Sequence, residues 1–225
     1  MQDVFDITVY SNFAAAILSV AVAFYLFHIW NRQENRLYTD LPLVFSISFL
    51  VQAMNTAVLA FSTMGVLNVT MDLFRVRAIL IGTALIPLSV VLLVIWLPRL
   101  QRYYKYVVAL LAAYALAVPI MGTTQEMIMV SIIPVILVIL LGLIITFTVT
   151  WKTGRLEEVR SDLMVLSLVL MVVSQTAKVP LAAIGLVVLP DLITALSTII
   201  AALAITNPWA KRAEAVEPVE LVVEY

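Results

Sequence analysis

The feature that most constrains this chain is a series of seven long apolar runs, which together occupy most of its 225 residues. The runs cover residues 9–30, 41–64, 76–97, 104–121, 127–151, 163–187 and 191–207. A helix needs about 20 apolar residues to cross a hydrocarbon layer about 30 Å thick, whereas a barrel strand needs about 10 residues that alternate in polarity. Because the runs have the length and uniform polarity of helices, the sequence predicts an all-α fold, a polytopic integral membrane protein with a seven-transmembrane-helix bundle.

The seven runs and their short connections predict a single transmembrane domain over residues 1–209. Hydrophobic residues make up 64% of the chain and charged residues 12%, a composition more apolar than that of water-soluble domains. Residues 210–225 begin with Lys211 and Arg212 and then turn acidic, and they are predicted to form a short cytoplasmic tail. We therefore expect the chain to lie in the cell membrane, with the lipid bilayer as its main partner.

The distribution of basic residues predicts the orientation of the bundle. Ten of the thirteen Lys and Arg residues lie on one side of the predicted helices, and two, Arg75 and Arg77, lie on the other. Cytoplasmic segments carry an excess of Lys and Arg, and all four tryptophans lie at helix ends on the same side as the ten. We therefore expect the N-terminus outside and the C-terminus in the cytoplasm. The ten residues are Arg32, Arg36, Arg99, Arg102, Lys105, Lys152, Arg155, Arg160, Lys211 and Arg212.

Two stretches in the two halves of the chain run in parallel. Residues 30–41 and 151–163 each begin at a tryptophan and end in a hydroxyl residue followed by Asp and Leu, and the helix after each carries two polar residues three positions apart. This pattern is consistent with a parallel internal repeat of three, one and three helices, in which the fourth helix is an inverting linker. The alternative is that any two helices crossing in the same direction share aromatic belts, acidic caps and basic loops.

With a repeat of that kind, the topology resembles that of SWEET-type sugar transporters and microbial rhodopsins. The sequence has no proline-glutamine pair like the signature of the transporter group, and its last predicted helix, residues 191–207, has no lysine for a retinal Schiff base. The resemblance is therefore one of architecture, and the sequence indicates no family.

Composition also excludes several function classes. A net charge of −1 does not favour nucleic acid as a partner, and the absence of cysteine rules out disulfides and thiolate chemistry. A single histidine, His28, cannot supply the ligands of a multi-histidine metal site or a doubly ligated haem. The acidic residues all lie in loops, tails or helix ends, so no carboxylate is placed for a proton relay. We expect a non-enzymatic protein without a cofactor or a metal.

The candidate ligand-binding residues begin with Lys178, the ionisable residue predicted to lie deepest in the hydrocarbon. A charge at the centre of a membrane helix costs at least about 2.5 to 3.5 kcal/mol, so such a lysine needs a partner or a cavity. Gln175 lies on the same helix face as Lys178, and Gln52 and Asn55 have the same spacing at a comparable depth in the second helix. These four side chains are predicted to line one interior polar pocket.

Two further candidates, Arg75 and Arg77, lie at the predicted start of the third helix. With Lys178 they could form an outward-facing cationic funnel for an anionic or carbonyl-bearing ligand, or they could form a solvated interfacial cluster. Lys178 could also extend to the headgroup layer and pair with Asp72 or Asp191.

Two functions therefore remain open. The chain could bind a small neutral or anionic ligand in the polar pocket, as a transporter or as a sensor or receptor. It could instead be a non-catalytic accessory subunit of a membrane complex, in which the amides act as glue between helices at about 0.6 kcal/mol each. Small residues at four-residue spacing in the first and last helices favour close packing, either with each other or with a homo- or hetero-oligomeric partner.

Overall fold

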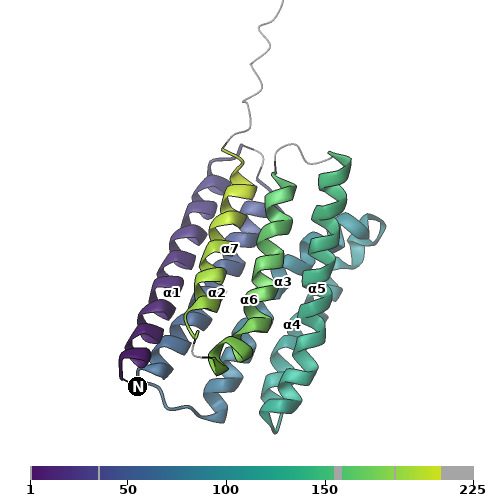
Figure 1. Cartoon of the computed structure of the whole chain (residues 1–225). Helices are drawn as coiled ribbons and strands as arrows, with labels where there is room; N and C mark the ends of the chain where they lie inside the picture. Colours follow the sequence, from purple (N-terminus) through teal and green to yellow (C-terminus); the bar gives the residue numbers. More distant parts are fainter. Residues whose placement is uncertain (1, 35, 155–158, 185, 209–225) are drawn as a thin grey trace, which may run out of the picture.

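The computed structural model describes residues 2–34, 36–154, 159–184 and 186–208, without the side chains of residues 2–6, 100, 178, 179, 182 and 183. Within these residues the chain is helical and has no strand, which confirms the predicted all-α class. The elements are α1 (Gln2–Asn31), α2 (Leu41–Thr63), α3 (Met71–Trp96), the 3-10 helix η1 (Pro98–Tyr103), α4 (Tyr104–Met121), α5 (Gln125–Thr153), α6 (Ser161–Ala183) and α7 (Leu189–Thr206) (Figure 1).

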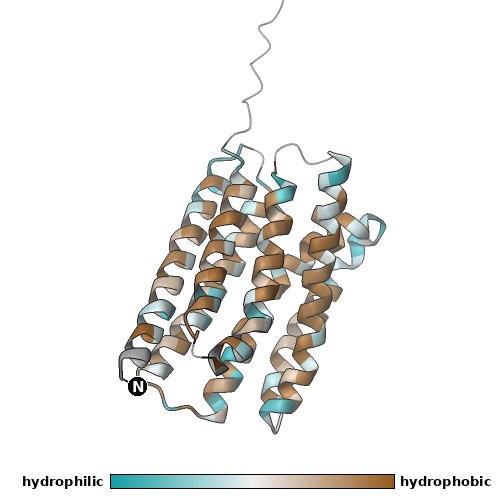
Figure 2. Ribbon diagram, in the orientation of Figure 1, coloured by the Kyte–Doolittle hydropathy of each residue, from teal (hydrophilic) through white to brown (hydrophobic). Residues whose placement is uncertain are grey.

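Six of these helices are long and apolar enough to cross a membrane: α1, α2, α3, α4, α5 and α7. The apolar part of α6 that the structure describes in full is shorter, Ser161–Ala177. Figure 2 shows hydrophobic residues along the middle of the helices and hydrophilic residues gathered near their ends. Length and polarity together support a multi-pass membrane protein.

Local capping explains where two of the helices begin. The Thr70 hydroxyl accepts a hydrogen bond from the Leu73 amide, and the Thr124 hydroxyl accepts one from the Met127 amide, both at 3.2 Å. As a result α3 begins at Met71 rather than at the predicted residue 76, and α5 begins at Gln125 rather than at 127. At its other end α5 stops at Gly154, whose positive φ of 63° is favourable for glycine.

The bounds of the other helices also differ from the sequence expectation. α1 begins at Gln2 rather than at residue 9, so the polar residues before the first apolar run continue the helix. α6 ends at Ala183 rather than at residue 187, and α7 begins at Leu189 rather than at 191. Terminal helical turns depend on capping and charge, which hydropathy does not detect.

Six helices form a closed ring in the order α1, α2, α3, α5, α6 and α7, and α7 returns to pack on α1. α4 lies outside this ring and packs mainly on α3. Gly82 of α3 makes this approach close, because a Cβ atom there would lie 3.0 Å from the Cβ atom of Ala115 in α4. The two segments of the chain on either side of α4 therefore meet directly through α3 and α5.

Apolar side chains fill the ring. Leu26 from α1, Leu143 and Phe147 from α5, and Met164 from α6 are fully buried at its centre, in one cluster that also includes residues of α2, α3 and α7. Among the described residues, α4 contributes to this cluster through the partly buried Leu111. The centre of the bundle is thus packed with apolar side chains, and polar groups lie along the seams between helices.

Candidate functional site

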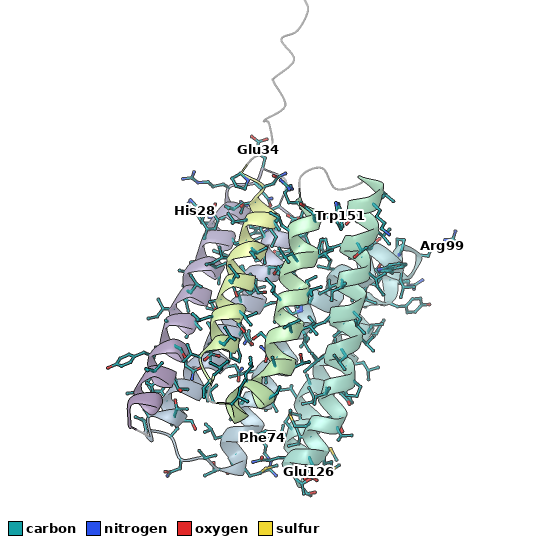
Figure 3. All side chains as sticks on the ribbon, in the orientation of Figure 1. His28, Glu34, Phe74, Arg99, Glu126 and Trp151 are labelled. Carbon is teal, nitrogen blue, oxygen red and sulfur yellow. The ribbon has the colours of Figure 1, made fainter. Side chains whose placement is uncertain are left out.

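Figure 3 labels residues at the two ends of the bundle, which we call the Glu126 end, where Phe74 and Glu126 lie, and the Trp151 end, where His28, Glu34 and Trp151 lie. Five of the six predicted ligand-binding residues have described side chains. Lys178 is the exception, since its backbone belongs to α6 and its side chain lies outside the described residues.

The structure brings Asn55 and Arg77 together on facing surfaces of α2 and α3, in the half of the bundle toward the Glu126 end. The Arg77 Nε–H donates a hydrogen bond of 3.3 Å to the Asn55 side-chain carbonyl oxygen. Asn55 is buried, with 8% of its surface exposed, and Arg77 is half-buried. Farther along the same contact the Ser48 hydroxyl donates to the Ala84 carbonyl at 2.9 Å. These two contacts define the α2–α3 seam.

Arg75 has a structural role that differs from that of Arg77. One guanidinium nitrogen pairs with the Asp72 carboxylate at 3.0 Å, and the other donates to the Gly122 carbonyl at 3.2 Å. The second bond ties α3 to the turn between α4 and α5. The Asp72 side chain is 85% exposed, so the ion pair lies at the surface and contributes little to stability.

Gln52 and Gln175, which were predicted to share one pocket, lie in different surroundings. Gln52 is half-buried one turn from Asn55, and its side chain makes no hydrogen bond with another described residue. Gln175 is exposed on the outside of α6. The described part of the predicted site is therefore Asn55 with Arg77, with Gln52 nearby on α2, Arg75 near the same end and Gln175 apart from them.

The prediction from sequence did not indicate how far Arg75 and Arg77 lie from the start of α3. The expected helix began after Arg75, which placed both arginines at the membrane surface, whereas α3 begins at Met71 and includes both. Thr70 followed by Asp72 is a helix-start signal that the sequence does contain, because a threonine cap and an acidic first turn satisfy and complement free amides. Arg77 consequently lies about 9 Å along α3 from its first residue.

A second group of polar contacts, between α6 and α7, was also missed. The Ser167 hydroxyl donates to the Ser197 carbonyl at 2.9 Å, and the Ser197 hydroxyl donates to the Ser167 carbonyl at 2.8 Å. About two turns farther along α6, the hydroxyls of Ser174 and Thr194 lie 2.6 Å apart, and the Ser174 hydroxyl also donates to the Pro190 carbonyl. These contacts define the α6–α7 seam. Serine and threonine are common throughout the chain, so sequence offers little to single these four out.

An apolar cavity lies apart from both seams. This cavity has a volume of about 640 Å³ and lies between the last third of α3, the first half of α4 and the middle of α5. Trp96, Leu111 and Val138 are among its lining residues, and nearly all of its lining is apolar. Within the described residues, no three His, Asp or Glu side chains gather in a way that could hold a metal ion.

Comparison with known proteins gives no relative on which to base a function. No protein-family model, curated protein or solved structure matches the chain. A functional proposal must therefore rest on the geometry of the chain itself.

Proposed function

We propose that the chain is a non-enzymatic cell-membrane protein of seven crossings that binds a small anionic solute around Arg77 and Asn55, as a transporter or a receptor. In this proposal the Glu126 end faces outward and the Trp151 end faces the cytoplasm. The excess of Lys and Arg in segments 31–40, 97–105 and 151–160 supports that orientation. It places the Arg77–Asn55 pair in the outer half of the bundle.

The observation that carries the proposal is that Arg77 has a neutral hydrogen-bond partner and no carboxylate among the described residues. α3 has 26 residues and is about 39 Å long, about 9 Å longer than the hydrocarbon is thick. If its two ends project equally, Arg77 lies a few Å inside the hydrocarbon. A guanidinium in that position is costly without a counter-charge, so it favours binding an anion.

The chemistry of the guanidinium group suits this role. Its planar set of N–H donors matches the geometry of a carboxylate or a phosphate, and Nε, which bonds Asn55, uses one of five donors. Gln52, half-buried and without a side-chain hydrogen bond in the described part of the chain, could orient a carbonyl or hydroxyl group of the same ligand. Lys178 stays in the proposal as a second cation, on the sequence argument alone.

The ring arrangement supports the seventh crossing and the internal repeat. α6 runs between α5 and α7 and packs on both, as α2 does between α1 and α3. The contact of α3 with α5 corresponds to the contact of α7 with α1, as expected for two triplets related by a pseudo-twofold axis. α4, outside the ring, takes the place of the inverting linker.

An accessory subunit of a larger membrane complex is the second candidate, and the exposure of α4 favours it. Most side chains of α4 are exposed, including Tyr106, Leu110 and Ile120, so another chain could cover this helix as readily as lipid does. Purification in mild detergent separates the two candidates. Stoichiometric co-purifying chains that are lost with bulky substitutions at Leu110 would support the subunit role.

Thermal unfolding of the purified protein tests the anion site, with succinate and inorganic phosphate as probes. At one hundred times its dissociation constant a ligand adds about 2.7 kcal/mol of stability, which corresponds to an increase in Tm of about 5 to 10 °C. We expect one of the two anions to produce this increase, Arg77→Gln to abolish it and Arg77→Lys to retain part of it. Arg160→Gln, which removes an exposed ion pair with Asp162, is the matched control. Failure of both anions, or an equal response in Arg77→Gln, would contradict the proposal.

Cysteine labelling tests the crossings, because the chain has no cysteine of its own. Single cysteines at the exposed positions Asn68 and Ile184 should react with an impermeant maleimide added to intact cells. Cysteines at Gln101, Thr153 and Pro208, also exposed, should react after the membrane is opened. Equal labelling of Thr153→Cys and Ile184→Cys from one side would show that α6 does not cross.

A further inference from the structure

We propose that the apolar cavity between α3, α4 and α5, which we call the groove, is a binding site for an anionic phospholipid. The lipid places one acyl chain in the groove and its phosphate against Arg99, Arg102 and Lys105. This inference is separate from the proposed solute site, because it involves other residues at the opposite end of the bundle. It requires only that the chain lies in a bilayer.

The groove exists because α4 leaves the ring. α4 packs on α3 and touches α5 sparsely, so an apolar cavity of about 640 Å³ opens between them. Its lining runs from Pro134 to Ile145 on α5, a distance of about 16 Å, which is close to half the thickness of the hydrocarbon. Gly142 adds room on this wall, because it presents no side chain toward Leu92 of α3. The groove therefore has about the length and the polarity of one acyl chain.

Polar contacts join the three helices at one end of the groove. The Trp96 indole N–H donates to the Thr146 hydroxyl at 2.7 Å, which fixes the ring across α3 and α5. The Tyr104 hydroxyl lies 2.8 Å from the carbonyl oxygens of Leu93 and Leu97, which holds the first turn of α4 against the last turn of α3. The segment directly after Trp96 is thereby held at the mouth of the groove.

That segment is strongly cationic. Arg99, Arg102 and Lys105 are all exposed and form no ion pair with the described residues, and Figure 3 shows Arg99 projecting away from the bundle. From residue 73 to residue 125 the sequence contains no Asp or Glu that could neutralise them. Three cations without an ion pair among the described residues, beside an apolar groove, complement a phosphate headgroup with its attached acyl chain. A zwitterionic lipid offers the same chain but no net negative charge.

Fluorescence quenching of Trp96 tests the site in the full-length protein. Trp30, Trp151 and Trp209 are replaced by Phe, and the protein is reconstituted in phosphatidylcholine with increasing fractions of brominated phosphatidylglycerol or brominated phosphatidylcholine. We expect half-maximal quenching at a mole fraction of brominated phosphatidylglycerol about tenfold lower than that of brominated phosphatidylcholine. Equal quenching by the two lipids would overturn the proposal.

Two sets of variants separate the headgroup contact from the groove. Arg99→Gln with Arg102→Gln and Lys105→Gln should remove the preference for phosphatidylglycerol, whereas Arg32→Gln with Arg36→Gln, also exposed and toward the Trp151 end, should keep it. Val138→Phe, at a groove position that is 70% exposed, should reduce quenching by both lipids. Leu141→Phe, exposed on the same helix outside the groove, should not. Unchanged quenching in Val138→Phe would overturn the proposal even if the glutamine variant failed to fold.

Discussion

The α2–α3 seam and the α6–α7 seam join neighbouring helices with polar groups of different kinds. In the α6–α7 seam, Ser167 and Ser197 exchange hydroxyl-to-carbonyl hydrogen bonds at 2.8 and 2.9 Å, and all four hydroxyl side chains are buried. In the α2–α3 seam, a long guanidinium reaches a single amide oxygen at 3.3 Å. Short hydroxyls satisfy hydrogen bonds across the seam and hold the helices close, whereas the long Arg77 side chain keeps donors that no described residue uses. The α6–α7 seam is therefore suited to packing, and the α2–α3 seam is suited to binding.

The largest effect is expected from filling the α6–α7 seam. Ser197→Leu places three additional carbon atoms where two helix backbones approach within hydrogen-bonding distance of a serine side chain. Overpacking of this kind costs about 1 to 3 kcal/mol of unfolding free energy. Thermal unfolding in detergent measures this cost, with Leu196→Val, at the preceding and half-exposed position, as the control. A Ser197→Leu protein as stable as the control would show that the seam is not closely packed.

A smaller effect is expected in the α2–α3 seam, measured by a double-mutant cycle on Asn55 and Arg77. Asn55→Leu leaves the guanidinium without its described partner and should destabilise the protein. Arg77→Leu leaves a buried amide oxygen unpaired but also removes a costly cation, so its loss of stability should be smaller. The double mutant should recover most of the loss, because an apolar pair replaces both groups. We expect a coupling energy between about 0.6 and 1.7 kcal/mol. Additive losses would mean that the two side chains do not interact.

The helical class was predictable from the sequence because a helix that crosses a membrane requires a long apolar stretch, which hydropathy detects directly. Each crossing needs about 20 apolar residues, and six of the described helices contain an apolar stretch of about that length. The ends of the helices were harder to predict, since α3 extends back from residue 76 through Arg75 and Asp72 to its cap at Thr70. Charged residues end an apolar run, but they do not end a helix, because long side chains can extend toward water while the backbone stays helical.

The side chains that face one another were the part that the sequence could not predict. Spacing of three residues puts Gln175 and Lys178 on one face of α6, but it does not say which face points inward. In a soluble helix the apolar face points to the core, whereas in a lipid-exposed helix both the core face and the outer face are apolar. The rotation of α6, which leaves Gln175 exposed, depends on the serines of the α6–α7 seam.

The smallest effect on stability is expected for a substitution of Gln175. This substitution tests whether Gln175 lies outside both the packing seam and the binding seam. Gln175→Ala should change the unfolding free energy by less than about 0.5 kcal/mol, because its exposed side chain belongs to neither seam. The response to succinate or phosphate should also be unchanged, whereas Gln52→Ala, half-buried beside Asn55, should weaken it. Thermal unfolding with and without the anion measures both. If Gln175→Ala removed the anion response, α6 would contribute to the binding site directly, and the separation between a packing seam and a binding seam would fail.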